Sequence, residues 1–185
     1  MLSIKSCPLP DSALLAKYQK SGAYTDCYQT EIPAKITQSH YISAFYSTPV
    51  FKLERIILKY LLSKPSSADQ LQLLAQGRTD SFAAWTVEDK CQNQLLMCDY
   101  RQRTRSWLMI EDIGRDTAPK TRLYFGSAVV PLKETHTRSS ASRQKIFTWL
   151  SSRALLGFHK AYSVLLLHCA KLRLGKTGPR NHGLR

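Results

Sequence analysis

Residues 143–174 carry the longest amphipathic pattern of the chain. Apolar side chains recur there every three or four positions between Ile146 and Leu172, which is the spacing of one helix face. Gly157 interrupts this run, and at 1.5 Å per residue the helix would be about 45 Å long. We therefore predict one long helix with a continuous apolar stripe, formed by Ile146, Phe147, Leu150, Ala154, Phe158, Ala161, Leu165, Cys169 and Leu172.

Upstream of this helix, the apolar pattern has the two-residue period of β-strands. A run rich in aromatic and β-favouring residues, 23–32, lies between Gly22 and Pro33 and is predicted to be a strand. Within 104–112 the alternation places Arg105 and Trp107 on the same face. Further strands are predicted at 82–87, 94–100 and 121–131, which makes five in all.

Short helices are predicted between the first and second of these strands. Ser39 can cap a helix over 40–47, and Thr48 followed by Pro49 is typical of a second helix start, continuing to about residue 63. The sequence 67–70 is a capping box, which predicts a third helix ending near Gly77. The chain therefore belongs to the α+β class: one strand, two or three short helices, a run of antiparallel strands and a long C-terminal helix.

This order of elements, over residues 23–174, resembles the helix-grip fold of the START/Bet v1-like superfamily. In that fold a curved antiparallel sheet wraps around a long C-terminal helix, and it typically has seven strands where we count five. Several stretches are also similar to a group of bacterial hypothetical proteins that carries no activity to transfer, namely 24–28, 51–55, 103–108, 123–129 and 157–163.

The resemblance implies a cavity between the sheet and the long helix that holds an apolar ligand. Pockets of this kind are mostly apolar and contain a few polar groups. A guanidinium beside an indole, as Arg105 and Trp107 provide, can bind an anionic or aromatic group. Alternatively, Trp107 and Tyr124 could fill the core while Arg105 extends its charged end to solvent or pairs with Glu111 or Asp99. The candidate cavity residues are Trp85, Asp99, Arg105, Trp107, Tyr124, His159 and Tyr162.

Positive charge is concentrated toward the C-terminus. The chain has 185 residues and a formal net charge of +14, and residues 135–185 hold ten basic side chains and no acidic one. A one-signed stretch attracts anions such as acidic lipid headgroups, or it simply keeps the protein soluble. We divide the chain into a leader (1–22), one domain (23–174) and a basic flexible tail (175–185).

Cysteine usage and the absence of nucleotide motifs restrict the function classes. The five cysteines lack CxxC or zinc-finger spacing, so we expect reduced thiols, no metal site and a cytoplasmic protein. Neither G-x-G-x-x-G nor a P-loop occurs, which predicts no cofactor. The segment 154–170 is too short and too polar to span a bilayer.

Three hypotheses of function follow. The first is binding of a hydrophobic or amphipathic small molecule or lipid under the long helix, with an anionic membrane surface as a possible partner. The second is a cofactor-independent hydrolase, cyclase or isomerase that uses the same cavity, with Asp99, Arg105, Tyr124 or His159 as acid, base or oxyanion partner. The third is a basic module for an acidic protein or for nucleic acid, the latter without support from any known nucleic-acid motif.

Overall fold

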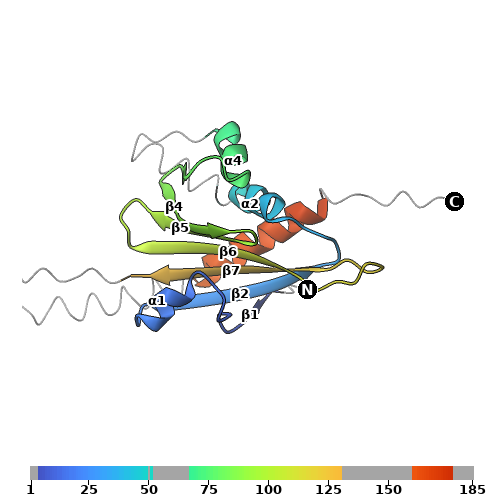
Figure 1. Cartoon of the computed structure of the whole chain (residues 1–185), viewed down its shortest axis with the longest axis horizontal. Helices are drawn as coiled ribbons and strands as arrows, with labels where there is room; N and C mark the ends of the chain where they lie inside the picture. The colour runs from blue at the N-terminus through green and yellow to red at the C-terminus, as the bar shows by residue number, and fades with distance from the viewer. Residues whose placement is uncertain (1–3, 50, 52–66, 131–159, 177–185) are drawn as a thin grey trace, which may run out of the picture.

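A seven-stranded antiparallel sheet forms the centre of the molecule. The computed structural model describes residues 4–49, 51, 67–130 and 160–176. The strand order across the sheet is β1-β2-β7-β6-β5-β4-β3, so that β2, early in the chain, pairs along its whole length with β7 (Figure 1). The strands are β1 (Lys5–Ser6), β2 (Tyr24–Ile32), β3 (Ser81–Phe82), β4 (Trp85–Cys91), β5 (Gln94–Asp99), β6 (Thr104–Asp112) and β7 (Thr121–Val129).

The α+β class is confirmed, whereas the prediction of five strands is wrong. One additional strand, β1, lies within the expected leader and pairs with the middle of β2. The other arises because the predicted strand 82–87 is divided into β3 and β4, with Phe82 paired with Trp85. The turn between them contains Ala83 at φ 56°, a left-handed conformation that favours Gly or Asn. Because the turn has neither residue, nothing in the local sequence marks it.

Of the three short helices in the described ranges, α1 (Ala16–Lys20) follows β1, whereas α2 (Gln38–Tyr46) and α4 (Ala68–Ala75) lie between β2 and β3. The helices α2 and α4 begin at a side-chain cap, whereas α1 does not. The α4 capping box is present as predicted: Ser67 accepts from the backbone of Gln70, and the Gln70 side chain accepts from the backbone of Ser67. The α2 cap is Thr37 instead of Ser39. Most of the predicted helix after Pro49 lies outside the described residues.

The sheet is covered on both faces. On one face, α2, α4 and the C-terminal helix (160–176) pack over an aromatic core that includes Tyr41, Phe45 and Phe125. On the other face, the N-terminal segment and α1 cover a second core around Leu15 and Trp107 (Figure 1). Residues 4–20 are thus part of the packed structure, which explains why β6 and β7 are buried on both faces.

Close packing of the second core depends on a glycine in β7. Gly126 is paired with Trp107 in the sheet. A Cβ at this position would lie 2.9 Å from a ring carbon of Trp107 and 3.0 Å from a methyl carbon of Leu15. Both distances are shorter than ordinary van der Waals contact, so the glycine gives the indole and the leucine their space.

The C-terminal helix presents a different face to the sheet from the one predicted. Its described part, 160–176, is a continuous helix, and 143–159 lie outside the described residues. Leu165 and Leu172, which belong to the predicted stripe, are 46% and 52% exposed. Local periodicity could not decide the face, because Val164 and the three leucines after it point to every side of the helix. The buried face is formed by Ser163, Leu166, Leu167, Ala170 and Leu174.

Candidate functional site

The predicted cavity residues lie on two faces of the sheet. Arg105 and Trp107 share one face of β6, as their spacing predicted, but this face is covered by the N-terminal segment and not by the C-terminal helix. Tyr124 of β7 packs beside them, with ring centroids of Trp107 and Tyr124 6.2 Å apart. Trp85 and Tyr162 instead pack against the core beneath the helices. The described members of the set therefore do not line one shared cavity.

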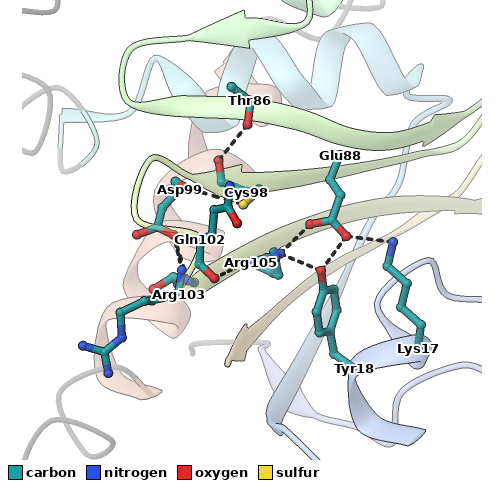
Figure 2. Close-up of polar contacts among 10 residues, drawn as sticks. Lys17, Tyr18, Thr86, Glu88, Cys98, Asp99, Gln102, Arg103 and Arg105 are labelled. Atoms are coloured by element: carbon teal, nitrogen blue, oxygen red, sulfur yellow. Dashed lines mark hydrogen bonds and ion pairs between the residues drawn. The ribbon is translucent and has the colours of Figure 1, made fainter. Parts of the chain in front are cut away.

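Arg105 belongs to a network of ionic contacts that ties α1 to the sheet (Figure 2). Its Nε donates to the Tyr18 hydroxyl at 2.7 Å and to the Glu88 carboxylate, and its Nη1 donates to the Gln102 carbonyl at 2.8 Å. The carboxylate partner of Arg105 is therefore Glu88, not Glu111 or Asp99. Glu88 also accepts from Tyr18 and pairs with Lys17 at 2.7 Å. The guanidinium carbon lies 4.8 Å from the centre of the Tyr18 ring, a cation–π distance.

The electrostatics of this network stabilise its charged form. Burial by itself would raise the pKa of Glu88, but hydrogen bonds from Lys17 and Tyr18 and the charge of Arg105 outweigh it, and the pKa is lowered. Burial and the hydrogen bond to Glu88 raise the pKa of Tyr18 to about 12. Glu88 is therefore a carboxylate engaged by three donors, an arrangement that suits positioning of α1 better than proton transfer.

The polar atoms of Trp107 and Tyr124 are likewise hydrogen-bonded to other side chains of the protein. The Trp107 indole donates to Gln94 at 2.8 Å, and the same amide oxygen accepts from the backbone of Leu14. The Tyr124 hydroxyl donates to Glu111 at 2.8 Å, and burial raises its pKa. These contacts join the N-terminal segment and the strands into the second core.

Asp99 closes the turn between β5 and β6. Its carboxylate accepts from the backbones of Arg103 at 2.7 Å and Thr104 at 2.9 Å. Asp99, Arg105 and Tyr124 thus each have their own partners and do not converge as an acid–base set. The remaining candidate, His159, lies outside the described residues.

A pocket of about 390 Å³ opens instead at the first half of β2. Its walls come from the end of β1 and the segment after it, from α1, from β2 and from the first described residue of the C-terminal helix. The pocket forms because β1 ends at Ser6, so that the β2 backbone at 24–26 lacks a strand partner on that side among the described strands. It is lined by Ser6, Cys7, Pro8, Leu9, Gln19, Tyr24, Thr25, Asp26, Cys27, Tyr28 and Lys160.

Two thiols lie side by side in the pocket wall. The sulfurs of Cys7 and Cys27 are 3.3 Å apart, and the Cys7 backbone N–H donates to the Cys27 carbonyl at 3.0 Å. The contact to Cys27 lowers the pKa of the Cys7 thiol against the opposing effect of burial, and the positive charge of Arg122 adds to the lowering. The same contact, together with burial, raises the pKa of Cys27.

The polar groups of the pocket differ in whether they have a hydrogen-bond partner. The Tyr24 hydroxyl is buried and has no hydrogen-bond partner within the described part of the chain. One oxygen of Asp26 accepts from the backbone and the hydroxyl of Ser127. Lys160 is exposed at the rim and adds a cationic side chain. The pocket lining therefore includes a tyrosine with an unsatisfied hydroxyl, a cation, a carboxylate and several apolar side chains.

The sequence alone did not indicate these pocket residues. Cys7 and Cys27 are twenty positions apart without a motif, and the first of them lies in a segment expected to be a leader. The predicted strand at 23–32 was the one available signal. A search of the leader for a strand that could pair with it would have pointed to the segment around Cys7. Among the described residues, no three His, Cys, Asp or Glu side chains could hold a metal ion.

Two further findings bear on the class of protein. No helix in the described ranges is long and apolar enough to cross a membrane. Comparison of the chain with protein families, with curated proteins and with solved structures finds no match. The fold itself is an α+β arrangement of a seven-stranded antiparallel sheet with a C-terminal helix, compatible with a helix-grip fold.

Proposed function

We propose that this protein binds an amphipathic small molecule with an anionic group in the pocket formed by β2, the end of β1, the segment after it and α1, with Lys160 at its rim. The observation that carries the proposal is the pocket itself, whose volume of about 390 Å³ falls in the range of small-molecule sites, roughly 300–1,000 Å³. The binding scaffold would be of the START/Bet v1-like, helix-grip type, and we place it in the cytoplasm.

The apolar part of the pocket lining supports a ligand with an apolar body. Pro8, Leu9, Tyr28 and the two thiols offer apolar and polarisable surface, as is common for ligand sites. Burial raises the pKa of Tyr28 to about 12, so its ring carries a neutral hydroxyl at physiological pH. An alkyl chain or an aromatic ring fits this wall better than a strongly hydrated molecule.

Two of the polar groups, Tyr24 and Lys160, support an anionic end, whereas one oxygen of the Asp26 carboxylate in the same lining is held by Ser127. The Tyr24 hydroxyl is a buried donor without a partner in the described ranges, so a ligand oxygen would satisfy it and recover part of its desolvation cost. Lys160 supplies positive charge at the same pocket. The net charge of +14 favours the approach of anions from a distance.

The test uses native mass spectrometry of gently purified protein, followed by titration with anilinonaphthalene sulfonate, an anionic aromatic fluorophore, and displacement by laurate. Lys160→Ala should weaken laurate binding several-fold, on the order of 1 kcal/mol, since one charge-assisted contact is lost. Lys176→Ala is the matched control, because it removes a lysine from the same helix outside the pocket.

A second pair of variants tests the tyrosine. Tyr24→Phe should also weaken laurate binding while leaving the free energy of unfolding unchanged or slightly higher, because it removes a hydroxyl that has no partner. Tyr124→Phe, whose hydroxyl bonds Glu111 outside the pocket, should leave laurate affinity unchanged. Absence of saturable binding, or equal effects of Lys160→Ala and Lys176→Ala, would overturn the proposal.

A further inference from the structure

The two thiols in the pocket wall occupy directly opposed positions of two antiparallel chains. Lys5 pairs with Gln29 and Ser6 with Tyr28, so the same register continued by one residue brings Cys7 opposite Cys27. The backbone hydrogen bond from Cys7 to Cys27 shows that it does continue. Opposed residues of this kind have Cα atoms about 5.5 Å apart, within the range of roughly 4.4–6.8 Å that a disulfide requires.

The side chains are also oriented for bond formation. The sulfurs already lie 3.3 Å apart, so little movement separates the two thiols from a bridge. Cys7 is half-buried and lines the open pocket, which gives a small oxidant access to its sulfur. Cys27 is buried behind it, in the position of a resolving thiol.

We propose that Cys7 and Cys27 are a redox-reactive pair that a peroxide converts reversibly into a disulfide across the pocket wall. The Cys7 thiolate attacks one peroxide oxygen, the O–O bond breaks, and hydroxide leaves with the electron pair, which forms a sulfenic acid on Cys7. The Cys27 sulfur then attacks the Cys7 sulfur, the S–O bond breaks, and the Cys27 proton leaves with that oxygen as water. In balance, two thiols and one hydrogen peroxide give one disulfide and two waters.

The acidities of the two thiols fit this order of steps. The thiolate is the reactive form of cysteine, and the pKa of Cys7 is lowered by its contact with Cys27 and by the charge of Arg122. The pKa of Cys27 is raised by the same contact, by burial and by the carboxylate of Asp26. Cys7 is also the more exposed of the two, so it is the sulfur that reacts first.

A disulfide here would covalently join the N-terminal segment to β2. It would close residues 7–27 into a loop and thereby restrict the unfolded chain. Because both cysteines belong to the pocket lining, the bridge would also change the shape of its wall. In a reducing cytoplasm such a bond is formed transiently and signals an oxidant, which is the usual role of disulfides in that compartment.

The experiment is treatment of the reduced full-length protein with equimolar hydrogen peroxide, followed by intact-mass and peptide analysis. We expect the loss of two hydrogen atoms, a linked pair of peptides carrying Cys7 and Cys27, and full reversal by dithiothreitol. Cys91 is the internal control, because it is exposed and its sulfur lies near Asn93 instead of another thiol. Cys7 should be consumed at least about tenfold faster than Cys91.

Two variants separate the steps. Cys27→Ser should stop at the sulfenic acid on Cys7, which dimedone traps, whereas Cys7→Ser should leave Cys27 unreacted on the same timescale. Oxidation of Cys91 as fast as Cys7, or a peptide map without the Cys7–Cys27 link, would overturn the proposal. The experiment measures covalent mass, so its result does not depend on whether the pocket binds a ligand.

Discussion

Arg105 joins three separate parts of the chain through one side chain. Its guanidinium contacts Tyr18 in α1, Glu88 in β4 and the carbonyl of Gln102 in the turn before β6. The partner Glu88 is contacted in turn by Lys17. A partly buried carboxylate with three donors keeps its charge, and this gives the N-terminal segment an electrostatic attachment to the sheet in addition to its apolar one.

The first prediction concerns Glu88→Gln and its dependence on pH. The folded pKa of Glu88 is lowered, so its stabilising effect is complete above the unfolded value and is lost as the pH falls through the folded pKa. At pH 7 the variant should reduce the free energy of unfolding by about 1 kcal/mol. Urea denaturation from pH 7 down to pH 3 should show this difference shrinking as the pH decreases.

The control for this prediction is Asp80→Asn. Asp80 pairs with Lys90 at 2.8 Å, but its side chain is 75% exposed, so its loss should cost less than about 0.5 kcal/mol. A Glu88→Gln effect that is equal to the control, or that grows toward acid, would contradict the assigned role of the carboxylate.

Among the secondary-structure elements, the C-terminal helix buries the face that contacts α2 and the sheet. Leu166, Leu167 and Leu174 contact the aromatic core formed with α2 and the sheet, while Leu165 and Leu172 face outward. Lys171 adds a polar contact by donating to Thr30 of β2 at 3.0 Å. Apolar side chains thus lie on both sides of the helix, and packing against the sheet buries one of the two sets.

The second prediction compares two leucines of this helix that are two residues apart. Leu167 is fully buried, so Leu167→Ala should reduce the free energy of unfolding by roughly 2–5 kcal/mol. Leu165 is 46% exposed, and Leu165→Ala should cost less than about 1 kcal/mol. Chemical denaturation of both variants gives the comparison, and the reverse order would mean that the helix packs through the stripe with Leu165.

At the scale of the whole molecule, the sheet has a protected centre and an exposed margin. The strands β6 and β7 have hydrogen-bonded neighbours on both edges and packed layers over both faces. The margin at β4 is different, since none of its seven residues is buried and its outer neighbour β3 has two residues. Opening of the structure should therefore begin at the β3–β4 side.

The third prediction is a gradient of hydrogen exchange across the sheet. Backbone amides in Thr104–Asp112 and Thr121–Val129 should exchange slowest, because their exposure requires global unfolding. Amides in Trp85–Cys91 should exchange at least about tenfold faster through local opening. Exchange followed by mass spectrometry measures both, and uniform protection across the sheet would contradict the layered description.

Features that depend on neighbours along the chain could be predicted from the amino-acid sequence. Caps and side-chain periods are local properties. For this reason the sequence predicted the capping box at Ser67, the strands from 94 to 129, the common face of Arg105 and Trp107, and the α+β order of elements. Which side of a strand or helix is covered depends on contacts between segments far apart in the chain. The face with Arg105 belongs to α1 since Tyr18 reaches it across 87 positions, and Cys7 meets Cys27 only because β1 pairs with β2. Local periodicity specifies that two residues share a face, whereas the partner that buries this face comes from contacts distant in sequence.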